Sequence, residues 1–172
     1  MNDKLSYIYN ILSNIDWNYH IVFTYPYLNQ RNNTLEAIKL RQNKLYRFTS
    51  RLSSYLKLRR NQHIFAYSDE YSDVQHGHLH ALYKLPEKYK GNDQQFIAMA
   101  QKVWPSALGI SPSQAKGINK LNISTISQAS YQNKVNYVAK KIMQTDSPSF
   151  LSKEAAKMIA TCNSGYENSS RN

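Results

Sequence analysis

The sequence predicts an α+β fold in which helices pack on one face of a central antiparallel β-sheet. Two patterns support this prediction: short segments rich in β-branched and aromatic residues, and longer segments whose apolar residues recur every three or four positions. They follow one another in the order β, α, β, β, α, β, α, which is typical of an α+β sandwich. The 172 residues fit one domain, with its body expected in 1–150 and a short helix and frayed tail in 151–172.

The first half of the chain is predicted to contain a strand over 20–27, followed by a long helix. The strand is indicated by Ile-Val-Phe-Thr-Tyr, and Pro26 closes it. Thr34 can cap the helix, which begins at Leu35. Residues at helical spacing predict the apolar face of this helix: Leu45, Phe48, Leu52 and Tyr55.

Two further strands are predicted over 64–70 and 78–85. The polar segment between them carries Gly77 and is predicted to be a hairpin loop. The next helix should begin at Asp93 and end near Pro105, because proline removes a helical hydrogen bond and crowds the preceding turn.

The last part of the chain begins with a loop over 106–117 that is rich in serine, proline and glycine. A strand over 117–126 follows, with the alternation that a sheet requires. Ser130 is the expected cap of the next helix, and a short final helix is expected over 153–161. The apolar face of the helix after Ser130 consists of Val135, Val138, Ala139 and Ile142.

The composition indicates a protein that binds polyanions. The chain has 22 lysines and arginines against 11 acidic residues, which gives a net charge of +11. Such an excess attracts polyanions over long range, so nucleic acid is the first candidate partner. Fourteen tyrosines can stack on unpaired bases, which favours a single-stranded nucleic acid.

The sequence also argues against a membrane or secreted protein. No apolar stretch approaches the roughly 18 residues that a membrane-spanning helix needs. The N-terminal residues lack the basic and then apolar pattern of a signal peptide. Cys162 is the single cysteine, which excludes an internal disulfide. We therefore expect a cytoplasmic protein.

Cations crowd the predicted outer face of the helix that begins at Leu35, where Glu36 is nearly the only acid. This face includes Arg41 and Lys44. It can follow a DNA backbone, or it can be a solvated surface without a ligand, and the residues leave both readings open. The candidates for DNA contact are Arg47, Arg51, Arg59 and Arg60.

A divalent-metal site is predicted on the strand over 78–85. Alternate side chains of a strand share a face, so His78 and His80 point the same way and Leu79 points into the core. Neutral imidazole is the commonest metal ligand in proteins. Glu70 ends the preceding strand and is the best third ligand, because the hairpin folds it back beside His78. His76, beside the turn, is held in reserve, and two aspartates are weaker candidates: Asp69 and Asp73.

A tyrosine with two lysines lies on the predicted helix after Ser130. Residues three and four positions apart share a helix face, so Lys140 or Lys141 can lie beside Tyr137. A free phenol has a pKa near 10 and is a poor nucleophile at neutral pH. A nearby cation and a metal-polarised phosphate both lower the barrier to its attack. Taken alone, this stretch is also typical of an ordinary amphipathic helix.

Together these motifs resemble the replication-initiator (Rep) branch of the HUH endonuclease superfamily. The family is named after His-hydrophobic-His, here within Gly77-His78-Leu79-His80-Ala81-Leu82. Its acidic ligand lies about eight residues earlier, where this chain has Glu70. Its tyrosine motif is similar to Tyr137-Val138-Ala139-Lys140, and its first motif to Phe23-Thr24-Tyr25-Pro26. The metal motif precedes the tyrosine, as in Rep proteins, whereas conjugative relaxases have the reverse order.

The resemblance implies a ferredoxin-like, RRM-like sheet within 1–150 and a single-tyrosine nuclease. Tyr137 would form a 5′-phosphotyrosine with single-stranded DNA at a plasmid or phage origin and so start rolling-circle replication in a bacterial host cell. Mg²⁺ or Mn²⁺ would be the cofactor, and Thr24 and Tyr25 would contact DNA. Tyr131 lies six positions from Tyr137, on a different helix face, and is no second nucleophile. A host helicase would be the partner, since the chain has no Gly-x-x-x-x-Gly-Lys loop.

Three alternatives remain open at this point. A transposase of the same superfamily would use the same residues. A histidine-triad nucleotide hydrolase would match His76, His78 and His80, although Gly77 is a poor apolar spacer and the basic charge does not suit a mononucleotide. A DNA-binding module with an inactive site would retain DNA without cutting it.

Overall fold

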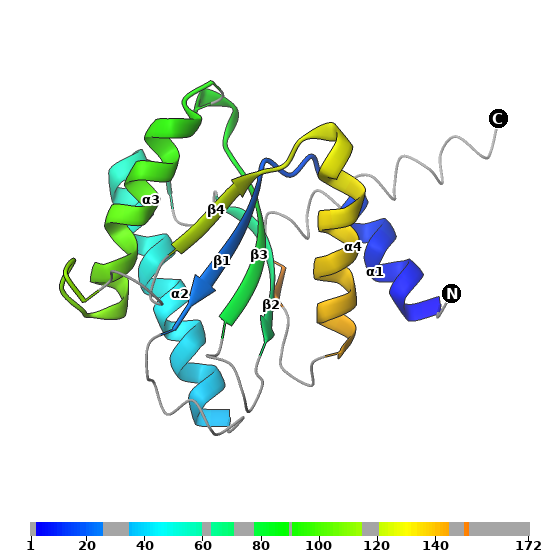
Figure 1. The fold of residues 1–172 in the computed structure, drawn as a ribbon, viewed down its shortest axis with the longest axis horizontal. Helices are drawn as coiled ribbons and strands as arrows, with labels where there is room; N and C mark the ends of the chain where they lie inside the picture. The colour runs from blue at the N-terminus through cyan, green and yellow to red at the C-terminus, as the bar shows by residue number, and fades with distance from the viewer. Residues whose placement is uncertain are drawn as a thin grey trace.

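The computed structural model describes residues 3–25, 35–59, 63–70, 78–89, 91–114, 121–144 and 150–151. They form an α+β domain built around one five-stranded sheet with the strand order β4-β1-β3-β2-β5 (Figure 1). Every neighbouring pair of strands is antiparallel. The elements are α1 (Asp3–Ser13), β1 (Tyr19–Thr24), α2 (Leu35–Leu56), β2 (Ile64–Glu70), β3 (His78–Lys84), a 3₁₀ turn (Glu87–Tyr89), α3 (Asp93–Leu108), β4 (Leu121–Thr125), α4 (Gln128–Gln144) and β5 (Phe150–Leu151).

The predicted order β, α, β, β, α, β, α is confirmed, and its topology is the ferredoxin-like split βαβ arrangement. The expectation that helices cover one face is wrong. Helices α2 and α3 cover one face of the sheet and α1 and α4 cover the other (Figure 1). The reason is that β3 is buried through five consecutive residues, so both of its faces are covered. None of the described helices is long and apolar enough to cross a membrane.

The two faces of the sheet have different cores. The α2–α3 side is aromatic, and Trp104 packs edge-on against Phe23 and Phe48 with ring centres 5.0 and 5.9 Å away. The α1–α4 side is smaller and largely aliphatic: Leu12, Ile15, Trp17, Ala66, Leu82, Val135, Val138 and Ala139. Small residues such as Ala66 and Ala139 allow α4 to lie close to the sheet.

Helix α1 is absent from the sequence-based prediction. Its apolar residues do recur at helical spacing, with Ile8 followed by Leu12 and then by Ile15 just past the helix end. The Trp17 indole donates to the carbonyl of Leu12 at 2.7 Å, which ties the helix end to β1. This helix completes the cover of the α4 side.

Helices α3 and α2 each differ from the prediction in one detail. Helix α3 passes through Pro105 to Leu108, where the Lys44 ammonium donates to the Leu108 carbonyl at 2.7 Å and Gly109 ends the helix with φ 79°. In α2, Tyr55 is 52% exposed, and Leu56 fills the core position instead.

Helix α4 begins one turn earlier than predicted, because Ser127 and not Ser130 is its cap. The Ser130 amide donates to Ser127 Oγ at 3.3 Å, and the Ser127 amide donates back to Ser130 Oγ at 3.1 Å. The loop over 71–77, the start of the strand expected over 117–126, and the helix expected over 153–161 lie outside the described residues.

Candidate functional site

The two histidines of the metal motif lie side by side on β3, on the face that α4 covers. The ring centres of His78 and His80 are 5.2 Å apart. Leu79 between them is fully buried in the aromatic core on the other face, as the alternation of a strand predicts. The strand is paired on both sides, and the registers align Val22 and Ser68 with His80. The imidazole pair therefore projects from the first residues of β3, which has a strand paired on either side.

Helix α4 brings Tyr137 onto this pair across 57 positions of sequence. The Tyr137 hydroxyl lies 3.4 Å from His80 Nε2, and the two ring centres are 4.9 Å apart. The buried residues Val135, Val138 and Ala139 anchor the helix to the sheet. Tyr137 itself is 39% exposed, so its ring lies over a histidine while part of it faces solvent.

For Glu70, the third predicted ligand, the structure describes the backbone position but not the side chain. The Cα of Glu70 pairs with the Cα of His78 across the β2–β3 hairpin, which is the register position expected for a ligand beside that histidine. The side chains of Glu70 and Asp69, and all of Asp73 and His76, lie outside the described part of the chain. Among the described side chains, no group of three histidine, cysteine or acidic residues is arranged to hold a metal ion.

The donor types nevertheless fit a divalent metal. Two imidazoles project from one strand, and a carboxylate residue occupies the facing register position. Imidazole and carboxylate together suit Mn²⁺ and comparable ions, whereas Mg²⁺ prefers oxygen alone. His78, His80 and Glu70 are therefore the candidate ligands for such an ion.

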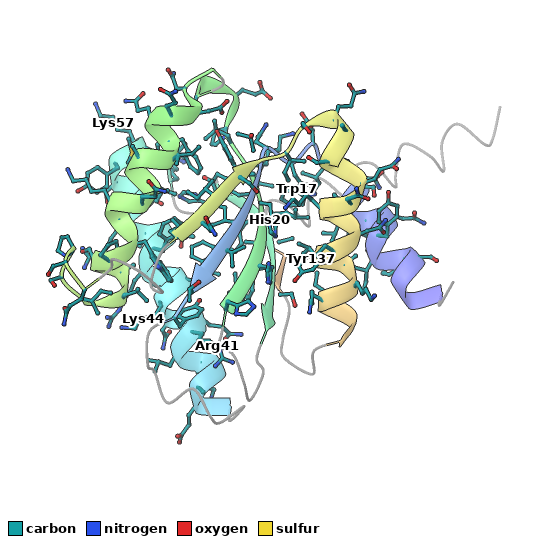
Figure 2. All side chains as sticks on the ribbon, viewed as in Figure 1. Trp17, His20, Arg41, Lys44, Lys57 and Tyr137 are labelled. Carbon is teal, nitrogen blue, oxygen red and sulfur yellow. The ribbon has the colours of Figure 1, made fainter. Side chains whose placement is uncertain are left out.

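A third histidine, His20 on β1, belongs to the site and was missed from the sequence. Its Nε2 lies 3.3 Å from His80 Nδ1, and its ring centre lies 6.2 Å from that of Tyr137. Figure 2 shows His20 and Tyr137 close together between the sheet and α4. His20 is only 7% exposed. Burial, followed by the charge of Lys134 and by His80, lowers its pKa to about 4, so the ring is neutral at neutral pH.

Helix α4 carries three lysines within four positions of Tyr137. The Lys141 ammonium lies 5.5 Å from the centre of the Tyr137 ring, and Lys140 is exposed. Lys134, which the sequence did not single out, reaches His20 Nδ1 at 3.5 Å. Helix α4 contains no acidic residue, so this side of the site is positively charged.

Tyr131 shows what a structural tyrosine on the same helix looks like. Its hydroxyl donates to the carbonyl of Ile15, just after the end of α1. Burial and the nearby Asp16 raise its pKa to about 12. Its packing against α1 agrees with the prediction that it lies on a different helix face from Tyr137.

The candidates for DNA contact have different positions in the fold. Thr24 pairs with His78 at the end of β1 and lies beside the site. Tyr25 is a correction: it is 1% exposed, packs against Trp104 and donates to the Arg41 carbonyl at 3.2 Å, so it is a core residue. Arg60 lies outside the described residues.

The basic helix α2 lies on the opposite side of the sheet from the histidines. Arg47 and Arg51 are exposed there, and Arg59 is exposed beyond the helix end. Arg41 is 3% exposed and is no part of an outer face, and Lys44 is bound to the end of α3. Figure 2 shows Arg41 and Lys44 on this helix, away from Tyr137. Among the described residues, the cations seen to contact the site are therefore those of α4.

No protein-family model matches the chain, and no curated protein is similar to it at a significant level. The chemistry of the site rests on its geometry. A partly exposed phenol lies against one of two paired imidazoles, with ammonium groups on the same helix. This arrangement suits a reaction in which a tyrosine oxygen attacks an anionic centre such as a phosphate.

Proposed function

We propose that this chain is a metal-dependent enzyme that nicks and rejoins single-stranded DNA through a tyrosine, in the manner of a rolling-circle replication initiator. The observation that carries the proposal is the 3.4 Å approach of the Tyr137 hydroxyl to His80 Nε2. A tyrosine placed only for helix packing has no reason to meet one particular histidine of a His-x-His pair. The net charge of +11 adds the attraction to a polyanion.

In this proposal the residues have separate tasks. Tyr137 Oη attacks the scissile phosphorus and forms a 5′-phosphotyrosyl bond, while the bond from phosphorus to the 3′-oxygen breaks. The phenol proton passes to solvent, and the departing 3′-oxygen takes up a proton. His78, His80 and Glu70 would hold Mg²⁺ or Mn²⁺, which would withdraw charge from the phosphate. Because the new bond is still a phosphodiester, attack by a 3′-hydroxyl can reverse the reaction and rejoin the strand.

The lysines of α4 provide the anion contacts. Lys140 and Lys141 follow Tyr137 by three and four positions, so they share its side of the helix. They stabilise the charge on the phosphate and hold the strand near the nucleophile. Thr24, which pairs with His78, would contact the DNA beside the metal site. The arginines of α2 would act at a distance, on DNA that continues around the domain.

The proposed setting is a single-stranded replication origin in a bacterial cytoplasm, with a host helicase to unwind the duplex. The chain would then start and end rolling-circle replication of a plasmid or phage. The reverse reaction at Tyr137 supplies the final joining step.

The test uses 5′- and 3′-end-labelled single-stranded oligonucleotides, both a random-sequence pool and a tiled set from the DNA that flanks the coding sequence. In Mn²⁺ we expect a covalent protein–DNA adduct and a free 3′-hydroxyl, and mass spectrometry should place the DNA on Tyr137. Tyr137→Phe should abolish the adduct. Tyr131→Phe is the matched control, because it removes a hydroxyl from the same helix that bonds to Ile15. An adduct that persists in Tyr137→Phe contradicts the proposal, whatever the result with Tyr131→Phe.

A further inference from the structure

Four polar side chains form a continuous row from helix α4 through the sheet and back to α4. Lys134 Nζ lies 3.5 Å from His20 Nδ1, His20 Nε2 lies 3.3 Å from His80 Nδ1, and His80 Nε2 lies 3.4 Å from the Tyr137 hydroxyl. Both histidines are 7% exposed. Each nitrogen of each ring therefore faces a partner in the row.

The two rings are placed so that their nitrogens can share a proton. Their planes differ by 15°, and their centres are 5.4 Å apart. The facing nitrogens are separated by 3.3 Å, so they lie between the two rings, along the line that joins the centres. That is the arrangement of an N–H group directed at a lone pair.

The Lys134 ammonium, at one end of the row, determines which nitrogen of each histidine carries the proton. A lysine ammonium can only donate, so His20 Nδ1 must accept from Lys134. A neutral imidazole has one N–H, which His20 then carries on Nε2 and donates to His80 Nδ1. The single N–H of His80 is left on Nε2, directed at the oxygen of Tyr137.

We infer that Lys134 and His20 are positioning residues that fix the tautomer of His80, so that its Nε2–H points at the Tyr137 oxygen. The role of this arrangement rests on the proposed function: in the metal-free state it holds the Tyr137 oxygen against His80 and keeps a proton on Nε2, the nitrogen that would bind the metal. Neither Lys134 nor His20 contacts the scissile phosphate in this scheme, and both act through His80.

Because each neutral imidazole carries one N–H, Lys134 should also weaken metal binding by His80. His80 offers the lone pair of Nε2 to a cation only when its proton moves to Nδ1. His20 Nε2 must then accept, and the proton of His20 moves to Nδ1, against the Lys134 ammonium. Two donors would face each other across the 3.5 Å contact. Lys134 therefore opposes metal binding through His80 Nε2, and its contact with His20 breaks when the metal binds.

The experiment reads the tautomers directly, by long-range ¹H–¹⁵N NMR of the full chain at pH 7.5 with a chelator and without DNA. We expect the Nε2–H form for both His20 and His80, with signals assigned by His20→Gln and His80→Gln. In Lys134→Met, His80 should shift toward the Nδ1–H form, and Lys134→Arg should keep the wild-type form because arginine also only donates.

Calorimetric titration with Mn²⁺ supplies a second measurement. Lys134→Met should bind Mn²⁺ roughly fivefold more tightly, the factor that corresponds to one lost hydrogen bond. Lys102→Met is the control for net charge, because it removes one positive charge at an exposed position of α3. It should change neither the His80 tautomer nor the Mn²⁺ affinity. Circular dichroism verifies the fold of each variant, and Lys134→Gln replaces Lys134→Met if the latter does not fold.

The outcomes separate this inference from the proposed function. An Nδ1–H form of His80 in the metal-free wild type overturns the inference, whether or not Tyr137 forms an adduct. Equal changes in Mn²⁺ affinity in Lys134→Met and Lys102→Met also overturn it, because they reduce the effect to net charge. The expected tautomers in a chain that never nicks DNA support the proton row and contradict the proposed function alone.

Discussion

His20 makes the stability of the fold depend on pH in a defined window. The ring is 7% exposed, and burial lowers its pKa from 6.5 to about 4. The groups that face it are the ammonium of Lys134 from α4, His80 from β3, the ring of Tyr137, and Ser124, whose hydroxyl donates to the His20 carbonyl. None of these is an anion, so nothing described here compensates a positive charge on His20.

The sign and size of the effect follow from proton linkage. Between pH 6.5 and about 4 the unfolded chain binds a proton at His20 that the folded protein does not. The contribution of His20 to stability is therefore full above pH 6.5 and is lost as the pH falls toward 4. One pKa unit corresponds to about 1.4 kcal/mol, so the total loss is about 3 kcal/mol. That is a large part of the stability of a domain of this size.

The assay is urea unfolding of the wild type and His20→Gln at pH 7.5, 6.0, 5.0 and 4.5, with a chelator present. The other ionisable groups are common to both proteins, so their contributions cancel in the difference. We expect the wild type to be the more stable protein at pH 7.5 and to lose most of this advantage by pH 4.5. A difference in unfolding free energy that stays constant from pH 7.5 to 4.5 refutes the reasoning.

Three further predictions concern the cap, the DNA-binding side and the metal. Ser127→Ala should lower the unfolding free energy by about 1 kcal/mol in urea unfolding, because the reciprocal cap of α4 is lost; an unchanged midpoint would contradict this. Replacing Lys140 and Lys141 by methionine should reduce the salt dependence of single-stranded DNA affinity by about 1.4 in log–log slope, whereas the same change at Arg47 and Arg51 should have the smaller effect; the reverse ranking in fluorescence anisotropy titrations would move the DNA path to α2. Adduct formation should be faster in Mn²⁺ than in Mg²⁺ at equal concentration, because two ligands are imidazoles; faster reaction in Mg²⁺ would argue against both histidines as ligands.

Local pattern was enough to predict most elements of this fold. The strands around Ile21 and Leu79 and the helix around Val138 have the alternation or the helical spacing that decides secondary structure. The phase of α2 was harder, because Tyr55 and Leu56 both fit an apolar face and only packing against the sheet selects Leu56. Tyr25 was assigned to DNA contact through the family resemblance, although its ring completes the core beside Trp104.

The candidate site was predictable where its residues are neighbours in sequence. His78 and His80 follow from strand parity alone. His20 does not, because its role depends on β1 lying next to β3, a pairing of strands some sixty residues apart that no local pattern specifies. Lys134 could have been noticed as one turn before Tyr137 on the same helix, but its partner His20 only appears once the sheet is assembled.

Pro105 illustrates the opposite case, in which a local rule loses to tertiary structure. A proline should end a helix, yet α3 continues for three residues beyond it. Trp104, Ala107 and Leu108 are buried on either side of the proline, and Lys44 supplies a donor for the Leu108 carbonyl. Burial of these side chains outweighs the one hydrogen bond that the proline removes.

The two halves of the site differ in how firmly they are held. His78 and His80 are part of β3, which is hydrogen-bonded to β1 on one side and β2 on the other. Tyr137 is carried by a helix that meets the sheet through side-chain packing. A phosphate group cannot enter between two atoms 3.4 Å apart. In the proposed reaction, Tyr137 would therefore have to move away from His80 before single-stranded DNA could place a phosphate between them. In such a movement β3 would stay in place and α4 would shift. The aliphatic packing between α4 and the sheet would then determine how easily the site opens.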